Sequence, residues 1–217
     1  MNSRIIMSED EKYWRERPAN DTRLDWRNNG GSWVDEYISS ADHPHRDLIL
    51  KAIEKHFTPL DSILEVGCNA GPNLLRIVSV HPNADIAGID VSTPAITKAK
   101  EILPEGEFKV ASGTHIPFSK DYFEVGLADA VLMYADPHTM HRIAREFQRV
   151  LNKGLILVEW YDESKEGVIK DHHWARDYGL FMQDYGFTCV EEKQLTETDW
   201  PHKTWHTHGR MFVFKKV

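Results

Sequence analysis

Short runs of branched apolar residues alternate with longer segments of helical periodicity from residue 62 onward. The runs predict strands, and the segments with apolar residues spaced three and four apart predict helices. The expected strands are 63–66, 85–90, 108–110, 122–128, 155–160, 187–191 and 210–215, and the expected helices are 47–57, 74–78, 93–103, 136–151 and 174–185. Alternation of this kind is typical of βαβ units, so the sequence predicts an α/β fold with a mainly parallel seven-stranded sheet.

Two helix starts carry a specific local signal. The dipeptides Thr93-Pro94 and Asp136-Pro137 each pair an N-cap residue with a proline, whose missing N–H costs nothing in the first helical turn. We therefore expect Thr93 and Asp136 to cap helices.

The first 45 residues differ in character from the rest. They hold aromatic residues among many charges and show no strand pattern; the aromatic residues include Tyr13, Trp14, Trp26, Trp33 and Tyr37. We expect residues 1–45 to form an aromatic cap or lid and residues 46–217 to form the main domain.

Composition and charge argue against several classes of protein. The chain has 217 residues and a formal net charge of −8, and it lacks the basic clusters that nucleic-acid binding needs. The cysteines, Cys68 and Cys189, are too few for a disulfide framework, so we expect free thiols and a cytoplasmic location. No apolar run is long enough to span a bilayer, and the start has no apolar export signal.

The segment Glu65-Val66-Gly67-Cys68-Asn69-Ala70-Gly71 lies where the first strand gives way to a helix. Its glycines allow a sharp turn and a close approach of backbone to ligand. Asp90 ends the next strand, where a carboxylate can accept hydrogen bonds from both ribose hydroxyls. The combination predicts a site for a cofactor that contains adenosine.

The charge and spacing of the turn favour one type of cofactor. Dinucleotide sites use Gly-x-Gly-x-x-Gly, whereas the pattern here is Glu-x-Gly-x-x-x-Gly. The Glu65 carboxylate would repel a pyrophosphate and attract a ligand that carries an ammonium and a sulfonium.

These motifs resemble those of the class I S-adenosylmethionine-dependent methyltransferases, over about residues 62–160. Further matching positions are Gly88, Ile116-Pro117-Phe118 and Val131-Leu132. The resemblance implies a Rossmann-like, doubly wound sheet with helices on both faces and S-adenosylmethionine as cofactor. The residues that it implies for cofactor binding are Glu65, Gly67, Cys68, Asn69, Gly71, Asn73, Asp90, Val91, Ser112, Gly113, Thr114, Asp129 and Ala130.

Asn69 and Ser112 are two of the positions that depart from the family pattern; Tyr134, in place of a frequent histidine, and Lys153-Gly154-Leu155, with one glycine of the usual pair missing, are the others. Asn69 replaces a glycine, and Asn is one of the few side chains that tolerate the left-handed backbone region. Ser112 replaces the acidic residue that commonly holds the adenine amino group, which leaves adenine recognition to Ser112, His115 or backbone groups near Gly113 and Thr114.

Residues just after the fourth and fifth strands are the candidates for catalysis, because ligands bind beyond the carboxyl ends of parallel strands. We expect Tyr134, His138 and Glu159 in this role. A general base is needed only for acceptors that must lose a proton.

The tryptophans lie outside 62–159 and suit an acceptor pocket or lid. For substrate and lid contacts we name Trp33, Tyr37, Trp160, His172 and His173. The histidines His202, His206 and His208 would need a strand to share a face, and no cysteine or carboxylate completes a zinc pattern, so we expect no metal.

These observations predict a methyltransferase that acts on an oxygen or nitrogen of a small molecule, with neither nucleic acid nor membrane as a partner. The alternatives are a protein or peptide methyltransferase, a cofactor-binding accessory subunit without catalysis, and an NAD-dependent oxidoreductase. The sequence leaves the oligomeric state open, a homodimer included.

Overall fold

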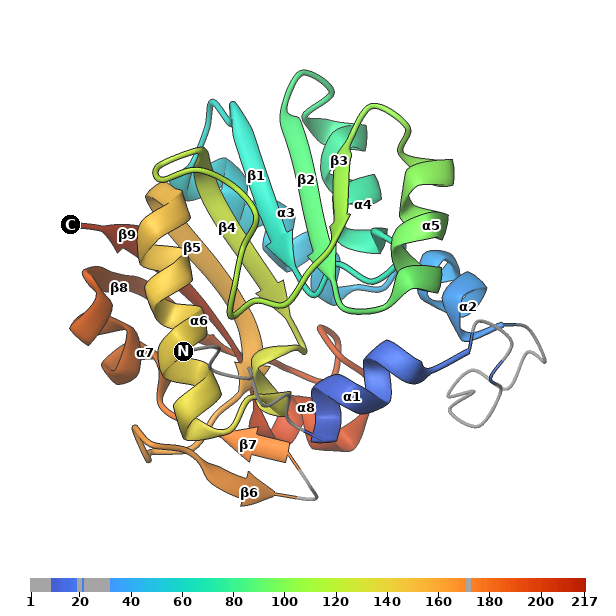
Figure 1. The fold of residues 1–217 in the computed structure, drawn as a ribbon. Helices are drawn as coiled ribbons and strands as arrows, with labels where there is room; N and C mark the ends of the chain where they lie inside the picture. Colours follow the sequence, from blue (N-terminus) through green and yellow to red (C-terminus); the bar gives the residue numbers. More distant parts are fainter. Residues whose placement is uncertain (1–8, 19–20, 22–31, 171–172) are drawn as a thin grey trace, which may run out of the picture.

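A seven-stranded sheet forms the centre of the computed structural model, which describes residues 9–18, 21, 32–170 and 173–217 (Figure 1). The strand order is β3-β2-β1-β4-β5-β9-β8. The first five strands are parallel, whereas β9 runs antiparallel to β5 and β8 antiparallel to β9. The prediction of a mainly parallel, doubly wound sheet is therefore confirmed.

The strands of this sheet are β1 (Ser62–Val66), β2 (Asp85–Asp90), β3 (Glu107–Val110), β4 (Phe123–Asp129), β5 (Leu151–Trp160), β8 (Phe187–Gln194) and β9 (Gly209–Lys216). A separate two-stranded sheet pairs β6 (Val168–Lys170) with β7 (His173–Ala175). The helices are α1 (Glu9–Glu16), α2 (Trp33–Ser39), α3 (His45–His56), α4 (Pro72–Val80), α5 (Thr93–Ile102), α6 (Pro137–Val150), α7 (Tyr178–Phe181) and α8 (Lys203–His208), with short 3-10 turns η1 (Leu132–Tyr134) and η2 (Met182–Tyr185).

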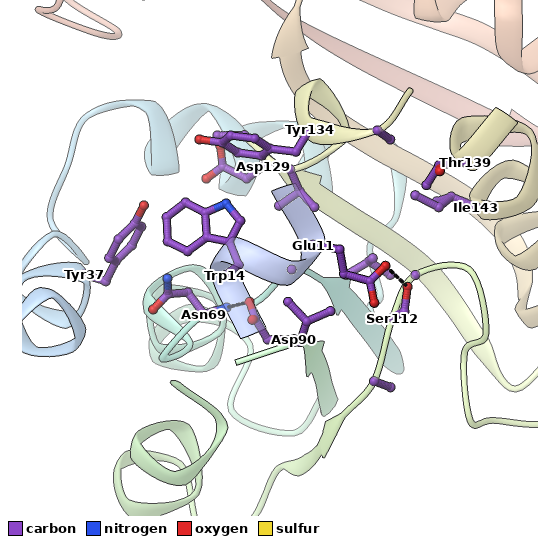
Figure 2. Close-up of a pocket in the computed structure, with 18 residues that line it drawn as sticks. Glu11, Trp14, Tyr37, Asn69, Asp90, Ser112, Asp129, Tyr134, Thr139 and Ile143 are labelled. Carbon is purple, nitrogen blue, oxygen red and sulfur yellow. Dashed lines mark hydrogen bonds between the residues drawn. The ribbon is translucent and has the colours of Figure 1, made fainter. Parts of the chain in front are cut away.

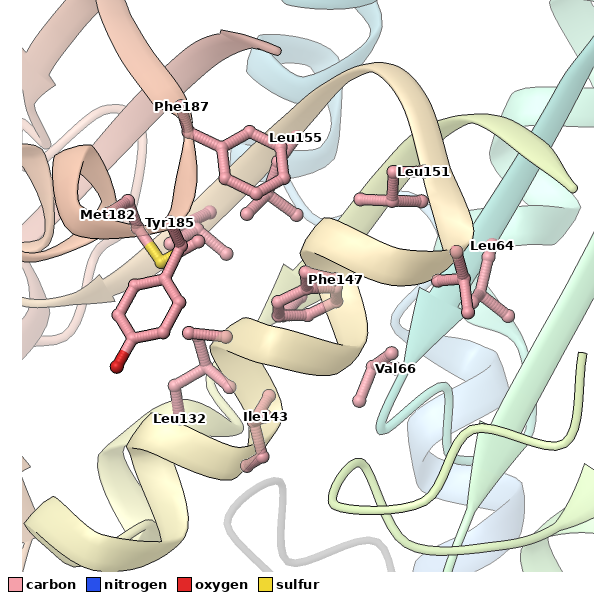
Figure 3. Close-up of a cluster of buried hydrophobic side chains, with 14 of the residues drawn as sticks. Leu64, Val66, Leu132, Ile143, Phe147, Leu151, Leu155, Met182, Tyr185 and Phe187 are labelled. Atoms are coloured by element: carbon pink, nitrogen blue, oxygen red, sulfur yellow. The ribbon is translucent and has the colours of Figure 1, made fainter. Parts of the chain in front are cut away.

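Successive residues of the central strands point to opposite faces, and both faces are apolar. In β5, Leu155 and Leu157 belong to one core cluster and Ile156 and Val158 to the other. The first cluster packs against α6, α7 and η2, where Phe147 lies at its centre (Figure 3). The second packs against α3, α4 and α5. Because helices cover both faces, the edge at the carboxyl ends of the strands is left for a ligand site.

One of the two predicted helix caps is confirmed, and the other lies one residue earlier than predicted. The Asp136 carboxylate accepts the Thr139 N–H at 3.0 Å, so the predicted cap of α6 is confirmed. The cap of α5 is Ser92, one residue earlier than predicted, because its hydroxyl rather than that of Thr93 accepts the Ala95 N–H.

Three predicted elements differ in the structure. The helix expected over 174–185 begins only at Tyr178, because Ala175 pairs with Val168 in the small sheet and Asp177 caps the helix that follows. Strand β5 begins at Leu151 rather than at 155. Helix α8 was not predicted, and His206 and His208 lie on it, so they do not share the face of a strand.

Candidate active site

A pocket lies at the carboxyl ends of the first four strands, and α1 and α2 close its outer side (Figure 2). Strands β1, β2 and β4 and the loops after all four strands contribute to its wall. The lining residues are Glu11, Trp14, Tyr37, Val66, Gly67, Asn69, Asp90, Val91, Ala111, Ser112, Gly113, Asp129, Ala130, Val131, Tyr134, Ala135, Thr139 and Ile143. Eight of the residues predicted to bind cofactor are therefore brought together here.

The glycine turn forms the floor of the pocket. The N–H groups of Gly67 and Cys68 both donate to the carbonyl oxygen of Ile89, at 2.8 and 3.0 Å, so the turn is joined to the end of β2. Gly67 has a φ of 74°, and a Cβ atom there would lie 2.3 Å from Cγ2 of Val131. Only glycine fits both the backbone angle and the space. Asn69 has a φ of 49°, the left-handed conformation predicted for it.

Asp90 is held rigidly beside the turn. One carboxylate oxygen accepts the Asn69 N–H at 2.9 Å and the other accepts the Ser92 N–H at 2.8 Å. Burial raises the pKa of Asp90, and these backbone donors oppose that effect. Each oxygen keeps a further lone pair, so the carboxylate can also accept from a ligand in the pocket.

A buried polar network surrounds Asp129 at the end of β4. Its Oδ2 accepts from Asn73 Nδ2 at 2.9 Å and from Arg46 at 3.3 Å, and it contacts His45 Nε2 at 2.8 Å. Arg46 also donates to the Asn73 side-chain oxygen and to the Ser40 carbonyl. Although burial opposes ionisation, these partners lower the pKa of Asp129 to about 2. Asp129 is therefore a permanent negative charge in the pocket wall.

Glu65 extends the network below the pocket surface. Its Oε1 accepts from Asn73 Nδ2 at 2.6 Å, and burial raises its pKa to about 8. Its other oxygen, Oε2, and the Oδ1 of Asp129 are buried and make no hydrogen bond within the described residues. Two buried carboxylate oxygens without partners favour a cationic ligand, because a positive group would offset the cost of burying them.

The opposite end of the pocket receives a carboxylate from the N-terminal segment. Ser112 donates to Glu11 on α1 at 3.3 Å and also contacts the Thr114 hydroxyl at 3.0 Å (Figure 2). Glu11 thus brings a carboxylate to position 112, where the family pattern has an acidic residue. Thr114 supports Ser112 and does not line the pocket.

Aromatic side chains form the outer wall. Trp14 packs edge-on against Tyr134 and Trp33, with ring centroids 5.8 and 6.0 Å apart. Trp33 is only 2% exposed and lies behind Trp14, where its indole N–H donates to the Pro18 carbonyl. Tyr37 and Tyr134 line the pocket, whereas Trp33 supports the wall from behind.

Glu159, one of the residues predicted to be catalytic, holds the turn after β4 through its carboxylate. It is fully buried and accepts the backbone N–H groups of Val131, Leu132 and Met133 at 2.8 to 3.1 Å. Arg176, also fully buried, donates to carbonyl groups of the same turn, those of Leu132 and Ala135. The pair thus fixes the turn that carries Ala130, Val131 and Tyr134 into the pocket.

The remaining predicted residues lie around the pocket. His138 is exposed on the first turn of α6 and does not line the pocket. The ring centroids of Trp160 and His173 lie 4.8 Å apart, and those of His173 and Tyr134 lie 5.0 Å apart. His172 lies outside the described residues.

Cys68, Gly71 and Asn73 act behind the pocket surface. The thiol of Cys68 packs in the core, Gly71 has a φ of 84° at the start of α4, and Asn73 links the two carboxylates. Cys68 and Cys189 are both free thiols, as predicted. Among the described residues, no cluster of three or more His, Cys, Asp or Glu could hold a metal ion, and no helix is long and apolar enough to cross a bilayer.

Several site residues have no strong signal in the sequence. Glu11 and Trp14 lie more than fifty positions before the glycine turn, and Arg46 follows His45 on an otherwise ordinary amphipathic helix. The proline at position 44, just before His45, is the one local sign that a helix begins there.

Comparison with known proteins agrees with this geometry. Residues 63–154 match a family model described as a methyltransferase domain. The chain is 29% identical over 84 residues to methyltransferase ungE' of Aspergillus campestris. The alignment covers 36% of this chain and 25% of that protein. It is 26% identical over 176 residues to trans-aconitate 2-methyltransferase of Rhodopseudomonas palustris. The alignment covers 76% of this chain and 62% of that protein.

Among solved structures, magnesium protoporphyrin IX methyltransferase from Synechocystis PCC 6803, with bound S-adenosylmethionine, superposes with a TM-score of 0.69. The identity is 15%, and the match covers 97% of this chain and 99% of that one. The likeness extends over the whole fold, the N-terminal helices included. The sequence match to the methyltransferase model covers less than half of the chain, and the solved structure shares the fold of the whole chain.

Proposed function

We propose that this protein transfers a methyl group from S-adenosylmethionine to an oxygen or nitrogen atom of a small molecule. The observation that carries the proposal is the distribution of charge along the pocket. A carboxylate suited to ribose lies at the end of β2, and two buried carboxylate oxygens without partners lie toward β1 and β4. That arrangement complements a ligand with a ribose at its middle and a positive charge at one end.

Each part of the pocket has a distinct task in this proposal. Asp90 binds the ribose hydroxyls, Glu11 and Ser112 accept from the adenine amino group, and Asp129 with Glu65 attracts the ammonium group. When bound, S-adenosylmethionine supplies a methyl group already activated by a sulfonium. The chain's own residues align the acceptor and exclude water, and the aromatic wall of Trp14, Tyr37 and Tyr134 suits that purpose.

We further propose that residues 1–45 act as a lid over this pocket. Glu11, Trp14 and Tyr37 all come from that segment and line the pocket. A closed aromatic wall favours a small acceptor over a protein substrate, which would need an open groove.

Calorimetry with S-adenosylhomocysteine and with NAD tests the cofactor assignment. We expect micromolar binding of S-adenosylhomocysteine and none of NAD, because the carboxylates would repel a pyrophosphate. Preference for NAD would contradict the proposal. Transfer of labelled methyl groups to a metabolite extract then tests catalysis: label on small molecules supports the proposal, label on protein bands alone favours a protein methyltransferase, and no label favours an accessory subunit.

The substitution Asp90→Ala should weaken binding of S-adenosylhomocysteine by about 1.5–3 kcal/mol, because it removes charge-assisted hydrogen bonds to the ribose. The matched control is Asp85→Ala, which removes an exposed carboxylate from the opposite end of the same strand and should leave affinity unchanged. Equal affinities for the two variants would contradict the ribose assignment.

Cofactor affinity should rise with pH from about pH 6 to pH 8. In the free protein the pKa of Glu65 is raised to about 8, so near neutral pH this carboxyl group is mainly protonated. A cationic ligand stabilises the ionised form, so binding should release a proton. Calorimetry in two buffers of different ionisation enthalpy measures this release. Glu65→Gln should abolish the release, and proton uptake by the wild type would contradict the proposed charge interaction.

A further inference from the structure

The side chain of Asn69 brings an amide to the pocket wall, at a position where the family pattern has a glycine. Its oxygen Oδ1 accepts the Ala70 N–H at 2.7 Å, and Asn69 lines the pocket (Figure 2). Because a backbone N–H needs an acceptor, this contact fixes which atom of the amide is oxygen and which is nitrogen. The nitrogen Nδ2 makes no hydrogen bond within the described residues. Both of its N–H groups are therefore available to a ligand.

The hydroxyl of Tyr37 is a second donor at the same end of the pocket. Tyr37 lies on α2 and Asn69 in the turn before α4, and these two helices contact each other. Both residues line the pocket, and Figure 2 shows them on the side away from Ser112. The Tyr37 hydroxyl makes no hydrogen bond with the part of the chain that the structure describes. Burial raises the pKa of Tyr37 to about 12, so the hydroxyl keeps its proton and can donate.

The other polar side chains of the pocket wall are engaged elsewhere or carry a negative charge. Ser112 and Thr139 each donate to a carboxylate of the protein. Asp90 and Asp129 are carboxylates and would repel an anion. Tyr134 packs in the aromatic wall against Trp14. An anionic group of the ligand would therefore find its side-chain donors at the end of the pocket that carries the amide and the phenol described above.

We infer that Asn69 and Tyr37 bind the α-carboxylate of S-adenosylmethionine, and that they make the site selective for nucleosides with an amino-acid tail. This inference rests on the proposed function. The ammonium and the carboxylate of the tail are attached to one carbon atom, so an ammonium group near Asp129 and Glu65 brings the carboxylate close as well. Repulsion by the protein carboxylates directs it toward the neutral donors. A glycine at position 69 could not supply this side-chain donor.

Calorimetry of the full-length protein with two ligands tests the inference without any turnover. The ligands are S-adenosylhomocysteine and its decarboxylated analogue, in which an aminopropyl group keeps the cationic amine and lacks the carboxylate. Asn69→Asp tolerates the φ of 49° and keeps an oxygen for the Ala70 N–H, but it replaces the donor with a negative charge. We expect it to weaken S-adenosylhomocysteine about 30-fold or more, and to leave the analogue unchanged or more tightly bound. Equal weakening of both ligands would overturn the inference, as would equal affinity of the wild type for both.

Three further variants separate the donors from other effects. Asn83→Asp adds the same charge to an exposed turn before β2 and should change neither affinity. Asn69→Gly and Tyr37→Phe each remove a donor without adding charge, and each should weaken S-adenosylhomocysteine about 10-fold while the analogue stays within about twofold. Wild-type affinity for S-adenosylhomocysteine in either variant would overturn the role of that side chain. A wild-type protein that binds neither ligand would contradict the proposed function itself, and the inference with it.

Discussion

Replacing Arg46 with methionine should lower the free energy of unfolding by about 3–5 kcal/mol, because it leaves the buried Asp129 carboxylate without the guanidinium that pairs with it. The guanidinium is almost completely buried and joins Asp129, Asn73 and Ser40, which belong to three different parts of the chain. Methionine keeps the volume of the stem and removes the charge and the donors. Urea unfolding monitored by circular dichroism measures the change.

The control for this prediction is Arg76→Met. Arg76 also pairs with an aspartate, Asp47, at 2.9 Å, but both side chains are substantially exposed, so the loss should stay within about 1 kcal/mol. A similar small loss in Arg46→Met would show that His45 and Asn73 alone can hold Asp129 in its ionised form.

Replacing Glu159 with alanine should destabilise the protein by at least about 3 kcal/mol and disorder the turn after β4. The substitution leaves three buried N–H groups without an acceptor, and each costs about 1–3 kcal/mol. Chemical denaturation measures the loss, and amide exchange at Val131, Leu132 and Met133 locates it.

A graded series distinguishes this role from a catalytic one. In Glu159→Gln the side-chain oxygen can still accept from Val131 and Leu132, but the amide nitrogen cannot accept from Met133, so the loss should be intermediate. Glu163→Ala removes an exposed carboxylate nearby and should have little effect. Loss of methyl transfer in Glu159→Gln with unchanged stability and unchanged exchange would restore the catalytic assignment.

The sheet was predictable because its evidence is local. The central strands are short and rich in apolar residues, and the turn from Glu65 to Gly71 combines a strand end, glycines and a helix start within a few residues. The segment 174–185 was harder to predict, because its apolar spacing fits a helix while the partner strand Val168–Lys170 is what fixes Ala175 as extended. Pairing between short strands is a tertiary effect that periodicity does not report.

The site residues also divide into those that the sequence predicts and those whose role only the fold reveals. Asp90 follows from its position at the end of a strand, whereas the role of Glu159 depends on which backbone N–H groups the fold brings to it. Both are acidic residues near the carboxyl ends of strands, and only the contacts separate a group that faces the pocket from one that supports it. Glu11 and Trp14 could not be found by spacing, because nothing in their neighbouring residues indicates which part of the domain they meet.

The contact between Glu11 and Ser112 has a practical consequence for handling the protein. It brings Glu11, from the first helix, to the end of the pocket that carries Ser112, whereas the last residue of the chain, Val217, is 86% exposed and follows the last strand away from the pocket (Figure 1). Purification tags and fluorescent labels therefore belong at the carboxyl terminus, and a fusion at the amino terminus should be expected to interfere with ligand measurements.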